Sequence, residues 1–287
     1  MATLPSRNIT KRRLCLTELG AVLTSPLRYP GGKSRGAPHI SKKVWARCNG
    51  QLLSPFVGGG SVELNLASQF DTDVVAYDSF GPLVDFWQCS LSDPRVLADR
   101  VESWLYPKTL EGKDSFYDIQ KMSTSSKLDS AARFFALNRS SHNGTTESGG
   151  CSTWQYAEGD RVPPGYPRFT LSSIDRLRRF RCPNLSVEQA DFKDSLSRHK
   201  DLFAYLDPPY MGNISQSLYG TRGSTHKGFD HDALYEILRK RAGWILSYDN
   251  SKGVKKMYSN FTVETPEWAY GMGADKKSRE LLIFSKD

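Results

Sequence analysis

Residues 204–210 read AYLDPPY, and this stretch decides the expected fold. A short apolar run ends in an acid, two prolines and an aromatic residue, which predicts a buried strand that the prolines stop. Ligands bind to open α/β sheets at the carboxyl ends of strands, so we expect Asp207 at such an edge, with Tyr210 just beyond it. The alternative interpretation is a Pro-Pro turn with a capping acid and no role in binding.

The groups in this stretch suit a planar amino group attached to a heterocycle. Proline has a fixed φ and no N–H, so the chain cannot easily redirect the Pro208 carbonyl. That carbonyl and the Asp207 carboxylate can accept the two N–H bonds of an amino group, while the Tyr210 ring stacks on the heterocycle. Asp207, Pro208, Pro209 and Tyr210 are therefore the candidate catalytic residues.

Composition and charge limit the classes of protein to consider. The 287 residues are 38% hydrophobic and carry a net charge of +8. A basic balance is typical of proteins that meet a polyanion, but charge alone does not assign nucleic acid as the partner. No apolar run approaches the roughly 20 residues of a membrane span, and Thr17 and Glu18 interrupt the apolar stretch near the N-terminus, which makes it a poor signal peptide. We expect a cytoplasmic protein that is neither secreted nor embedded in a membrane.

The five cysteines predict neither a zinc site nor a redox motif. They are widely spaced, and no C-x-x-C pair occurs. Their odd number fits reduced thiols in a cytosol-like compartment.

A glycine-rich stretch predicts a second part of the site. Residues 52–67 read LLSPFVGGGSVELNLA, which predicts a strand, a turn and a helix with Ser61 as its cap. Residues 74–78 predict another strand, which ends in Asp78. A glycine loop followed about 20 residues later by an acid fits a ribose or nucleoside site, whereas the glycine spacing does not fit a dinucleotide site. The alternative is an ordinary strand-to-helix turn.

Residues 29–33 read YPGGK and predict a tight turn that a ligand can approach closely. Lys33 places a charge at this turn, which otherwise would be an ordinary basic turn. The spacing of a P-loop is missing, so we do not expect a nucleoside triphosphatase.

The middle of the chain, from residue 86 to about 182, departs from the alternation of strands and helices. Helices are expected at 96–105, 113–122, 130–138 and 173–181. Asn143 followed by Gly144 predicts a hairpin turn, and a polar, glycine-rich loop follows at 145–165. A basic helix close to a polar hairpin fits phosphate contact plus base recognition, although a charged run is also typical of a solvated face.

The C-terminal part returns to strands, expected at 185–187, 202–206, 244–248, 261–264 and 280–284. Helices are expected at 230–242, capped by Asp230, and at 251–258. The polar stretch 211–228 predicts a mobile loop over the site. Asp191 and Phe192 follow a strand and could hold and cover an adenine.

In this order, the motifs resemble those of the Dam-like adenine-N6 DNA methyltransferases, the alpha group of the D12 class. The features that carry the resemblance are YPGGK at 29–33, PFVGGGS at 55–61, Asp78, NRSSHNG at 138–144, Asp191 with Phe192, and DPPY at 207–210. Each motif is modest, whereas the ordered set is specific. The family's first turn often has Ala-Gly-Gly where this chain has Pro-Gly-Gly, and residues 151–165 match loosely, so the recognised DNA sequence stays open.

The resemblance implies a fold of the α/β class: a Rossmann-like, S-adenosylmethionine-dependent methyltransferase sheet with an inserted, mostly helical target-recognition domain. The catalytic domain would comprise residues 26–85 and 186–287, the inserted domain 86–185, and an N-terminal extension 1–25. S-adenosylmethionine would be the methyl donor and S-adenosylhomocysteine the product, with no metal. The partner would be double-stranded DNA in a bacterial cytosol or that of a phage or viral host. A companion restriction endonuclease and a monomeric or weakly dimeric state are further expectations.

The resemblance also implies roles for individual residues. Lys33 and the loop 56–61 would face the methionine part of the donor, Asp78 the ribose, and Asp191 with Phe192 the donor adenine. The whole set expected at the donor is Tyr29, Lys33, Phe56, Gly58, Gly60, Ser61, Asp78, Asp191 and Phe192. The DPPY residues would hold a flipped-out adenine. The residues expected at DNA are Arg139, Asn143, Arg176, Arg178 and Arg179.

Other functions stay open at this point. A cytosine-N4 DNA methyltransferase or an RNA adenine methyltransferase can use a similar acceptor pair, and a DNA-binding relative could keep the fold without catalysis. A cytosine-C5 enzyme would need a cysteine nucleophile, typically in a Pro-Cys pair, and the sequence has no such pair. The glycine spacing disfavours a nucleotide-binding oxidoreductase.

Overall fold

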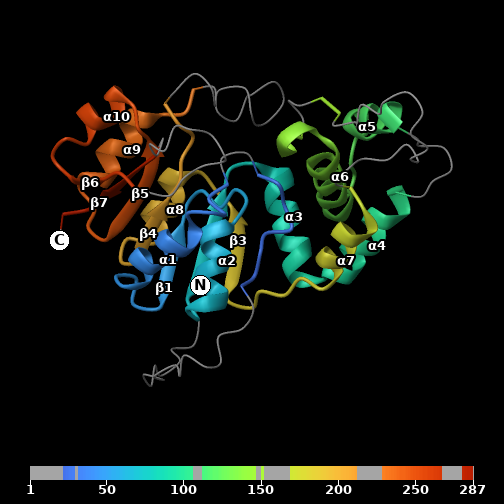
Figure 1. Cartoon of the computed structure of the whole chain (residues 1–287), viewed down its shortest axis with the longest axis horizontal. Helices are drawn as coiled ribbons and strands as arrows, with labels where there is room; N and C mark the ends of the chain where they lie inside the picture. The colour runs from blue at the N-terminus through green and yellow to red at the C-terminus, as the bar shows by residue number, and fades with distance from the viewer. Residues whose placement is uncertain are drawn as a thin grey trace.

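Seven strands form one mixed sheet in the computed structural model, in the order β3-β2-β1-β4-β5-β7-β6 (Figure 1). The structure describes residues 22–29, 32–105, 112–146, 150–151, 169–211, 228–266 and 280–286. The strands are β1 (Gln51–Ser54), β2 (Asp73–Asp78), β3 (Leu185–Gln189), β4 (Phe203–Leu206), β5 (Trp244–Asp249), β6 (Thr262–Glu264) and β7 (Glu280–Phe284). The first five pair in parallel, while β7 runs antiparallel to both β5 and β6. This arrangement confirms the predicted Rossmann-like α/β fold.

The strands β1, β4, β5 and β7 are buried on both faces, which explains their nearly continuous apolar runs, whereas the edge strand β6 is exposed. Successive side chains of a strand point to opposite faces. In β1, Leu52 therefore lies in one hydrophobic core and Leu53 in the other. In β5, Ile245 and Leu246 divide in the same way.

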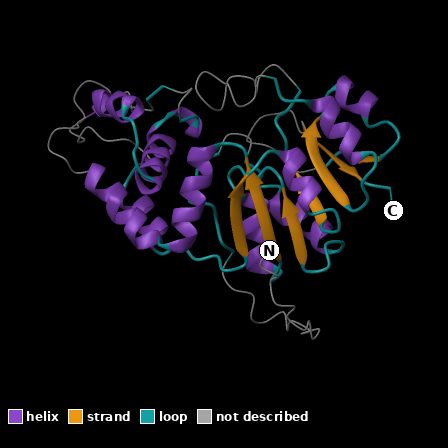
Figure 2. Cartoon of the chain, turned by 180° about the vertical axis from the view of Figure 1, so that it is seen from behind, coloured by secondary structure: helices purple, strands orange, loops and turns teal. Residues whose placement is uncertain are grey.

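Helices cover the two faces (Figure 2). The helices on one face are α1 (Ala37–Trp45), α2 (Ser61–Gln69) and α3 (Gly81–Ser92), and those on the other are α8 (Phe192–Arg198), α9 (His231–Leu238) and α10 (Lys252–Met257). Asp230 caps α9 as predicted, because its carboxylate accepts the Ala233 N–H at 2.9 Å. The predicted capping by Ser61 is wrong: Gly60, at φ 66°, precedes the first helical residue of α2, and no side chain caps this helix.

The elements described between β2 and β3 are helices, joined by short turns and loops. Its helices after α3 are α4 (Pro94–Leu105), α5 (Gly112–Lys121), α6 (Lys127–Ser140), the 3-10 turn η1 (His142–Gly144) and α7 (Leu171–Arg178). Figure 1 shows these helices gathered beyond the β3 end of the sheet, with α3 between them and the strands. They begin and end within a few residues of the predicted bounds. Most of the predicted loops 145–165 and 211–228, and residues 1–21, lie outside the described residues.

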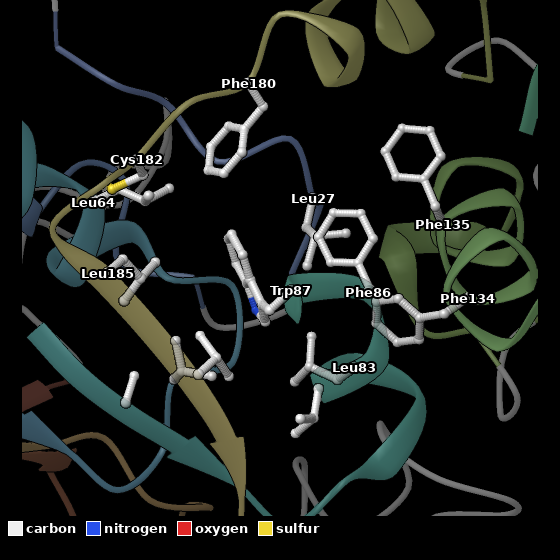
Figure 3. Packing of buried hydrophobic residues seen from close by; sticks show 14 of the residues in the cluster. Leu27, Leu64, Leu83, Phe86, Trp87, Phe134, Phe135, Phe180, Cys182 and Leu185 are labelled. Atoms are coloured by element: carbon white, nitrogen blue, oxygen red, sulfur yellow. The ribbon is translucent and has the colours of Figure 1, made fainter. Parts of the chain in front are cut away.

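Helix α3 joins this helical group to the sheet. Its side chains pack against β3 on one side and against α6 on the other (Figure 3). The Phe86 and Phe135 rings are stacked, with centroids 5.7 Å apart and an interplanar angle of 9°. The domain boundary predicted between residues 85 and 86 falls inside α3. The helices thus share one core with the sheet, and a separately folded target-recognition domain stays a prediction.

The order of the strands fixes where a ligand site is expected. The connections reverse direction between β1 and β4, so the carboxyl ends of these two strands flank the topological switch point, where open α/β sheets bind ligands. β1 runs into the glycine loop and β4 into Asp207. None of the described helices is both long and apolar enough to cross a membrane.

Candidate active site at the carboxyl ends of β1, β2 and β4

Asp207 follows β4 directly and forms an ion pair with Lys33. The two groups are 2.9 Å apart, between Nζ of Lys33 and Oδ1 of Asp207. Burial raises the pKa of Asp207 to about 6, with the charge of Lys33 lowering it and that of Glu280 raising it further. A carboxyl with this pKa is ionised at neutral pH and can still take up a proton during a reaction.

The ammonium of Lys33 lies among oxygens from two separate parts of the chain. It donates to the Tyr210 hydroxyl at 2.8 Å and lies 3.3 Å from Oε1 of Glu280. Burial alone would lower the pKa of Lys33, but the charges of Asp207 and Glu280 raise it above the ordinary value, so the group is charged. The resemblance placed Lys33 at the methionine part of the donor. In the structure it contacts Asp207 and Tyr210 of the DPPY stretch, and its place at the donor stays a prediction.

The glycine loop is fixed by groups around it. The Asp78 carboxylate accepts the N–H of Gly58 at 3.1 Å and that of Phe80 at 3.0 Å. Burial raises the pKa of Asp78, while the backbone N–H groups lower it. The loop has no room for side chains, because a Cβ on Gly59 would lie 2.5 Å from Cβ of Tyr29. Tyr29 thus lies beside the loop, and its contact with the donor stays a prediction. The Asp78 carboxylate retains lone pairs for further donors such as ribose hydroxyls.

Asp191 and Phe192 begin α8. Asp191 is exposed and caps the helix, accepting the Lys193 N–H at 2.7 Å. The Phe192 ring is 5% exposed and lies 5.8 Å from the Phe56 ring, between centroids. Phe229, which the sequence did not suggest, completes this aromatic cluster at 5.2 Å from Phe192. The structure therefore brings together the two phenylalanines predicted for the donor.

Comparison with known proteins agrees with this geometry. A family model described as D12 class N6 adenine-specific DNA methyltransferase matches residues 29–272. The chain belongs to this family. Two curated relatives, the DNA adenine methylases of Vibrio cholerae serotype O1 strains Classical Ogawa 395 and El Tor Inaba N16961, are each 25% identical over 242 residues, which cover 82% of this chain and 80% of theirs. The expected resemblance and enzyme class, an adenine-specific DNA methyltransferase, are confirmed.

The first residue of the NRSSHNG stretch in this methyltransferase, Asn138, has a structural role that the sequence did not reveal. Asn138 is fully buried and forms hydrogen bonds with both backbone groups of Arg28, accepting from N at 2.9 Å and donating to O at 2.7 Å. It also donates to the Gly144 carbonyl at 3.2 Å. Arg28 precedes Tyr29 and the turn that carries Lys33. Asn138 thus anchors the segment that leads into the site.

The predicted hairpin at Asn143 and Gly144 is only partly correct. Both residues have positive φ, 57° and 79°, as a tight turn requires. The described flanking residues form a single antiparallel bridge, Ser141 to Cys151, instead of paired strands, and Asn138 binds the Gly144 carbonyl from inside the turn. Asn143 is exposed and Arg139 is half-buried in the last turn of α6.

Helix α7 differs from the prediction in its surroundings. Arg178 forms ion pairs with Asp99 at 2.9 Å, with Asp175 at 2.8 Å and with Glu102. The helix packs against α4. The chain then enters β3 at its amino end, and the amino ends of the parallel strands lie opposite the carboxyl ends, where Asp207 is found. The structure therefore separates the exposed Arg176 and Arg179 from the site edge. Their phosphate contacts stay a prediction.

Glu63, in the first turn of α2, is a buried carboxyl that was not among the residues predicted for the site. It accepts the Ser54 hydroxyl at 2.6 Å. The apolar residues at 62, 64, 66 and 67, which are buried with it, are the sequence signal that could have identified it. Burial raises its pKa to about 7, and the Asp207 charge adds to this rise. No three His, Cys, Asp or Glu side chains gather as metal ligands in the described ranges, and the metal-free reaction stays a prediction.

Replacing Glu63 with glutamine should change how stability depends on pH. Because the folded pKa of Glu63, about 7, exceeds the ordinary 4.5, the contribution of Glu63 to stability is greatest below pH 4.5 and is lost as pH rises from 4.5 to 7. At about 1.4 kcal/mol per pKa unit, Glu63→Gln should gain about 2–3 kcal/mol relative to wild type between pH 5 and pH 8. Urea unfolding at both pH values measures this gain. Glu236→Gln is the control, since Arg239 lowers the pKa of that exposed carboxyl; an equal gain there would contradict the prediction.

Proposed function

We propose that this adenine-specific DNA methyltransferase transfers a methyl group from S-adenosylmethionine to N6 of an adenine that it holds outside the duplex. The observation that carries the proposal is the position of Asp207. It lies at the switch point that the strand order defines, and it contacts Lys33. The DPPY stretch, with Tyr210, begins at this same point. The target amino group is inaccessible inside a duplex, so the base must be extruded to reach this edge.

The residues around the glycine loop fit the proposed donor. Asp78 is a buried acid at the end of β2 with acceptor capacity for ribose hydroxyls, and Phe56 with Phe192 offers an aromatic surface for an adenine. Asp191, at the exposed start of α8, would accept from the adenine amino group. S-adenosylmethionine, when bound, supplies a methyl group on a sulfonium, which is a good leaving centre. The protein therefore needs no covalent nucleophile.

The catalytic residues act on the amino group of the target. Oδ1 of Asp207 faces Lys33, and Oδ2 would accept one N–H bond of N6 while the Pro208 carbonyl accepts the other. Two acceptors favour a pyramidal nitrogen whose lone pair points at the methyl group, and such positioning contributes about 7–11 kcal/mol in well-oriented systems. N6 loses one proton as the new bond forms, and Asp207, with a pKa of about 6, can carry it to water. Tyr210 would stack on the base, which contributes about 1–3 kcal/mol.

The partner that follows from the family is DNA. Duplex DNA as the form that is bound, a companion restriction endonuclease, a monomeric or weakly dimeric state and a cytosolic location belong to the proposal. The central test is transfer of labelled methyl from S-adenosylmethionine to unmodified duplex DNA. After the methylated sites are mapped, a duplex with 2-aminopurine at the target position tests extrusion, because its fluorescence rises when the base leaves the stack. Labelled DNA without such a rise would contradict base extrusion, and unlabelled DNA would contradict the proposed donor.

Arg139 and Arg176 should separate base recognition from bulk charge. Arg139→Ala should relax discrimination at one base pair by about 1–3 kcal/mol, because Arg139 lies in the last turn of α6, just before the turn that carries the exposed Asn143. Arg176→Ala removes the same charge from α7, away from the site edge, and should leave DNA affinity within about twofold. Binding to matched and mismatched duplexes over a range of salt measures both effects. A flatter salt dependence of DNA binding in Arg176→Ala would instead show that α7 contacts DNA phosphates.

A further inference from the structure

Glu280 is a buried carboxyl for which neither the sequence motifs nor the proposed mechanism has a role. It is the first residue of β7 and is 6% exposed. Its Oε1 accepts the Tyr210 hydroxyl at 2.7 Å and lies 3.3 Å from Nζ of Lys33. An acid at the start of an otherwise apolar strand thus contacts two side chains of the site.

The β5–β7 pair fixes the DPPY stretch at several points. Glu280 lies opposite Asp249 in the antiparallel register, and Asp249 accepts the N–H of Met211 at 3.0 Å. The Tyr210 ring lies over that of Tyr248, with centroids 6.1 Å apart and an interplanar angle of 27°. One face of Tyr210, its hydroxyl and the backbone after it are therefore all held by two adjacent strands.

We propose that Glu280 is a positioning residue for methyl transfer, which fixes the Tyr210 ring through its hydroxyl and holds the Lys33 ammonium beside Asp207. The inference rests on the proposed roles of Tyr210 and Asp207. A stacking ring contributes to catalysis only in the orientation that aligns N6 with the methyl group, and an ionised acceptor makes a stronger hydrogen bond than a neutral one. Glu280 acts on the substrate only through these two side chains.

The charge of Glu280 also affects the titration of the site. The ionisable groups around Asp207 are Lys33 from the N-terminal turn, Glu63 from α2, Tyr205 from β4, Glu280 from β7 and Tyr29. Among them Glu280 raises the pKa of Asp207 by charge repulsion. An ionised Asp207 is needed to accept from N6, so the rate falls as pH drops through this pKa. Removing the Glu280 charge should move this fall in rate, the acid limb of the pH profile, to lower pH.

The test measures kcat, the KM for S-adenosylmethionine and the pH profile of the full-length enzyme. Glu280→Ala should lower kcat about tenfold or more with the KM for the donor within about twofold, and Tyr210→Phe should lower it similarly. The double variant should be no slower than the slower single variant, because both remove one interaction. Glu280→Gln keeps an acceptor oxygen, so it should recover most of kcat while its acid limb moves to lower pH. Glu264→Gln, whose exposed carboxyl pairs with Lys43 at 2.7 Å, is the control and should match wild type.

Independent, multiplicative losses from Glu280→Ala and Tyr210→Phe would overturn the proposal, as would an unmoved acid limb in Glu280→Gln. If thermal unfolding shows that Glu280→Ala does not fold, Glu280→Gln replaces it. The kcat and the acid limb of Glu280→Gln are then measured alone and in combination with Tyr210→Phe, and an unmoved acid limb or multiplicative losses of kcat would overturn the proposal. Failure of the proposed function gives a different result: Asp207→Asn would then keep its turnover, whatever the Glu280 variants do.

Discussion

Asp207→Asn should lower the single-turnover rate of methyl transfer by about 10²–10⁴-fold, the range for loss of a positioned proton acceptor. Asparagine keeps the size of the side chain, but it cannot carry the proton from N6 and its amide presents one acceptor oxygen where the carboxylate has two. It also removes the charge that pairs with Lys33 at 2.9 Å. The rate is measured with saturating S-adenosylmethionine and excess enzyme over duplex DNA.

Donor binding should survive this substitution, because the groups proposed for the ribose and the adenine follow β1, β2 and β3, whereas Asp207 follows β4. We expect the Kd for S-adenosylmethionine, from isothermal titration, to stay within about threefold of wild type. The control is Asp194→Asn, which makes the same change on the exposed side of α8 and should have full activity. The wild-type rate should also fall as pH drops below about 6, the pKa of Asp207. Near-normal turnover by Asp207→Asn would rule out the assigned mechanism.

Gly144→Ala should produce the largest loss of stability among the substitutions considered. Gly144 has φ 79°, and a Cβ there would lie 1.9 Å from the Arg28 carbonyl oxygen. Backbone strain and overpacking each cost about 1–3 kcal/mol, so we expect about 2–5 kcal/mol from urea unfolding. Because Asn138 joins Gly144 to Arg28, the turn that carries Lys33 should shift as well.

Gly150→Ala is the matched control for this prediction. A Cβ at Gly150 meets no atom within 4 Å, and the carbonyl that accepts the His142 N–H is unchanged. We expect its free energy of unfolding to stay within about 0.5 kcal/mol of wild type. Equal stability of Gly144→Ala and Gly150→Ala would show that the close approach to Arg28 is not a structural requirement.

Local patterns were enough to predict the parts of the site that lie at strand ends. The AYLDPPY stretch contains its own strand and its own stop, and the glycine loop contains its strand, turn and helix. Asp78 follows from the same logic, since an acid at the end of a neighbouring parallel strand must lie at the same edge of the sheet. These features depend on neighbours in sequence, so sequence reasoning could find them.

The contacts that complete the site could not be predicted, because their partners are far apart in the chain. Lys33 and Tyr210 are 177 residues apart, Tyr210 and Glu280 are 70 apart, and Arg28 and Asn138 are 110 apart. Spacing within a motif contains no information on such pairs. The same applies to helix α7. Its sequence predicts its charge, but only the packing against α4 shows that Arg178 is paired with carboxylates.

The most direct test of the account is nucleoside mass spectrometry of unmodified duplex DNA after incubation with S-adenosylmethionine and either the wild-type protein or Asp207→Asn. The account predicts N6-methyladenine with the wild-type protein and about 10²–10⁴-fold less of it per unit time with the variant. N4-methylcytosine as the product, or equal N6-methyladenine from both proteins, would contradict it.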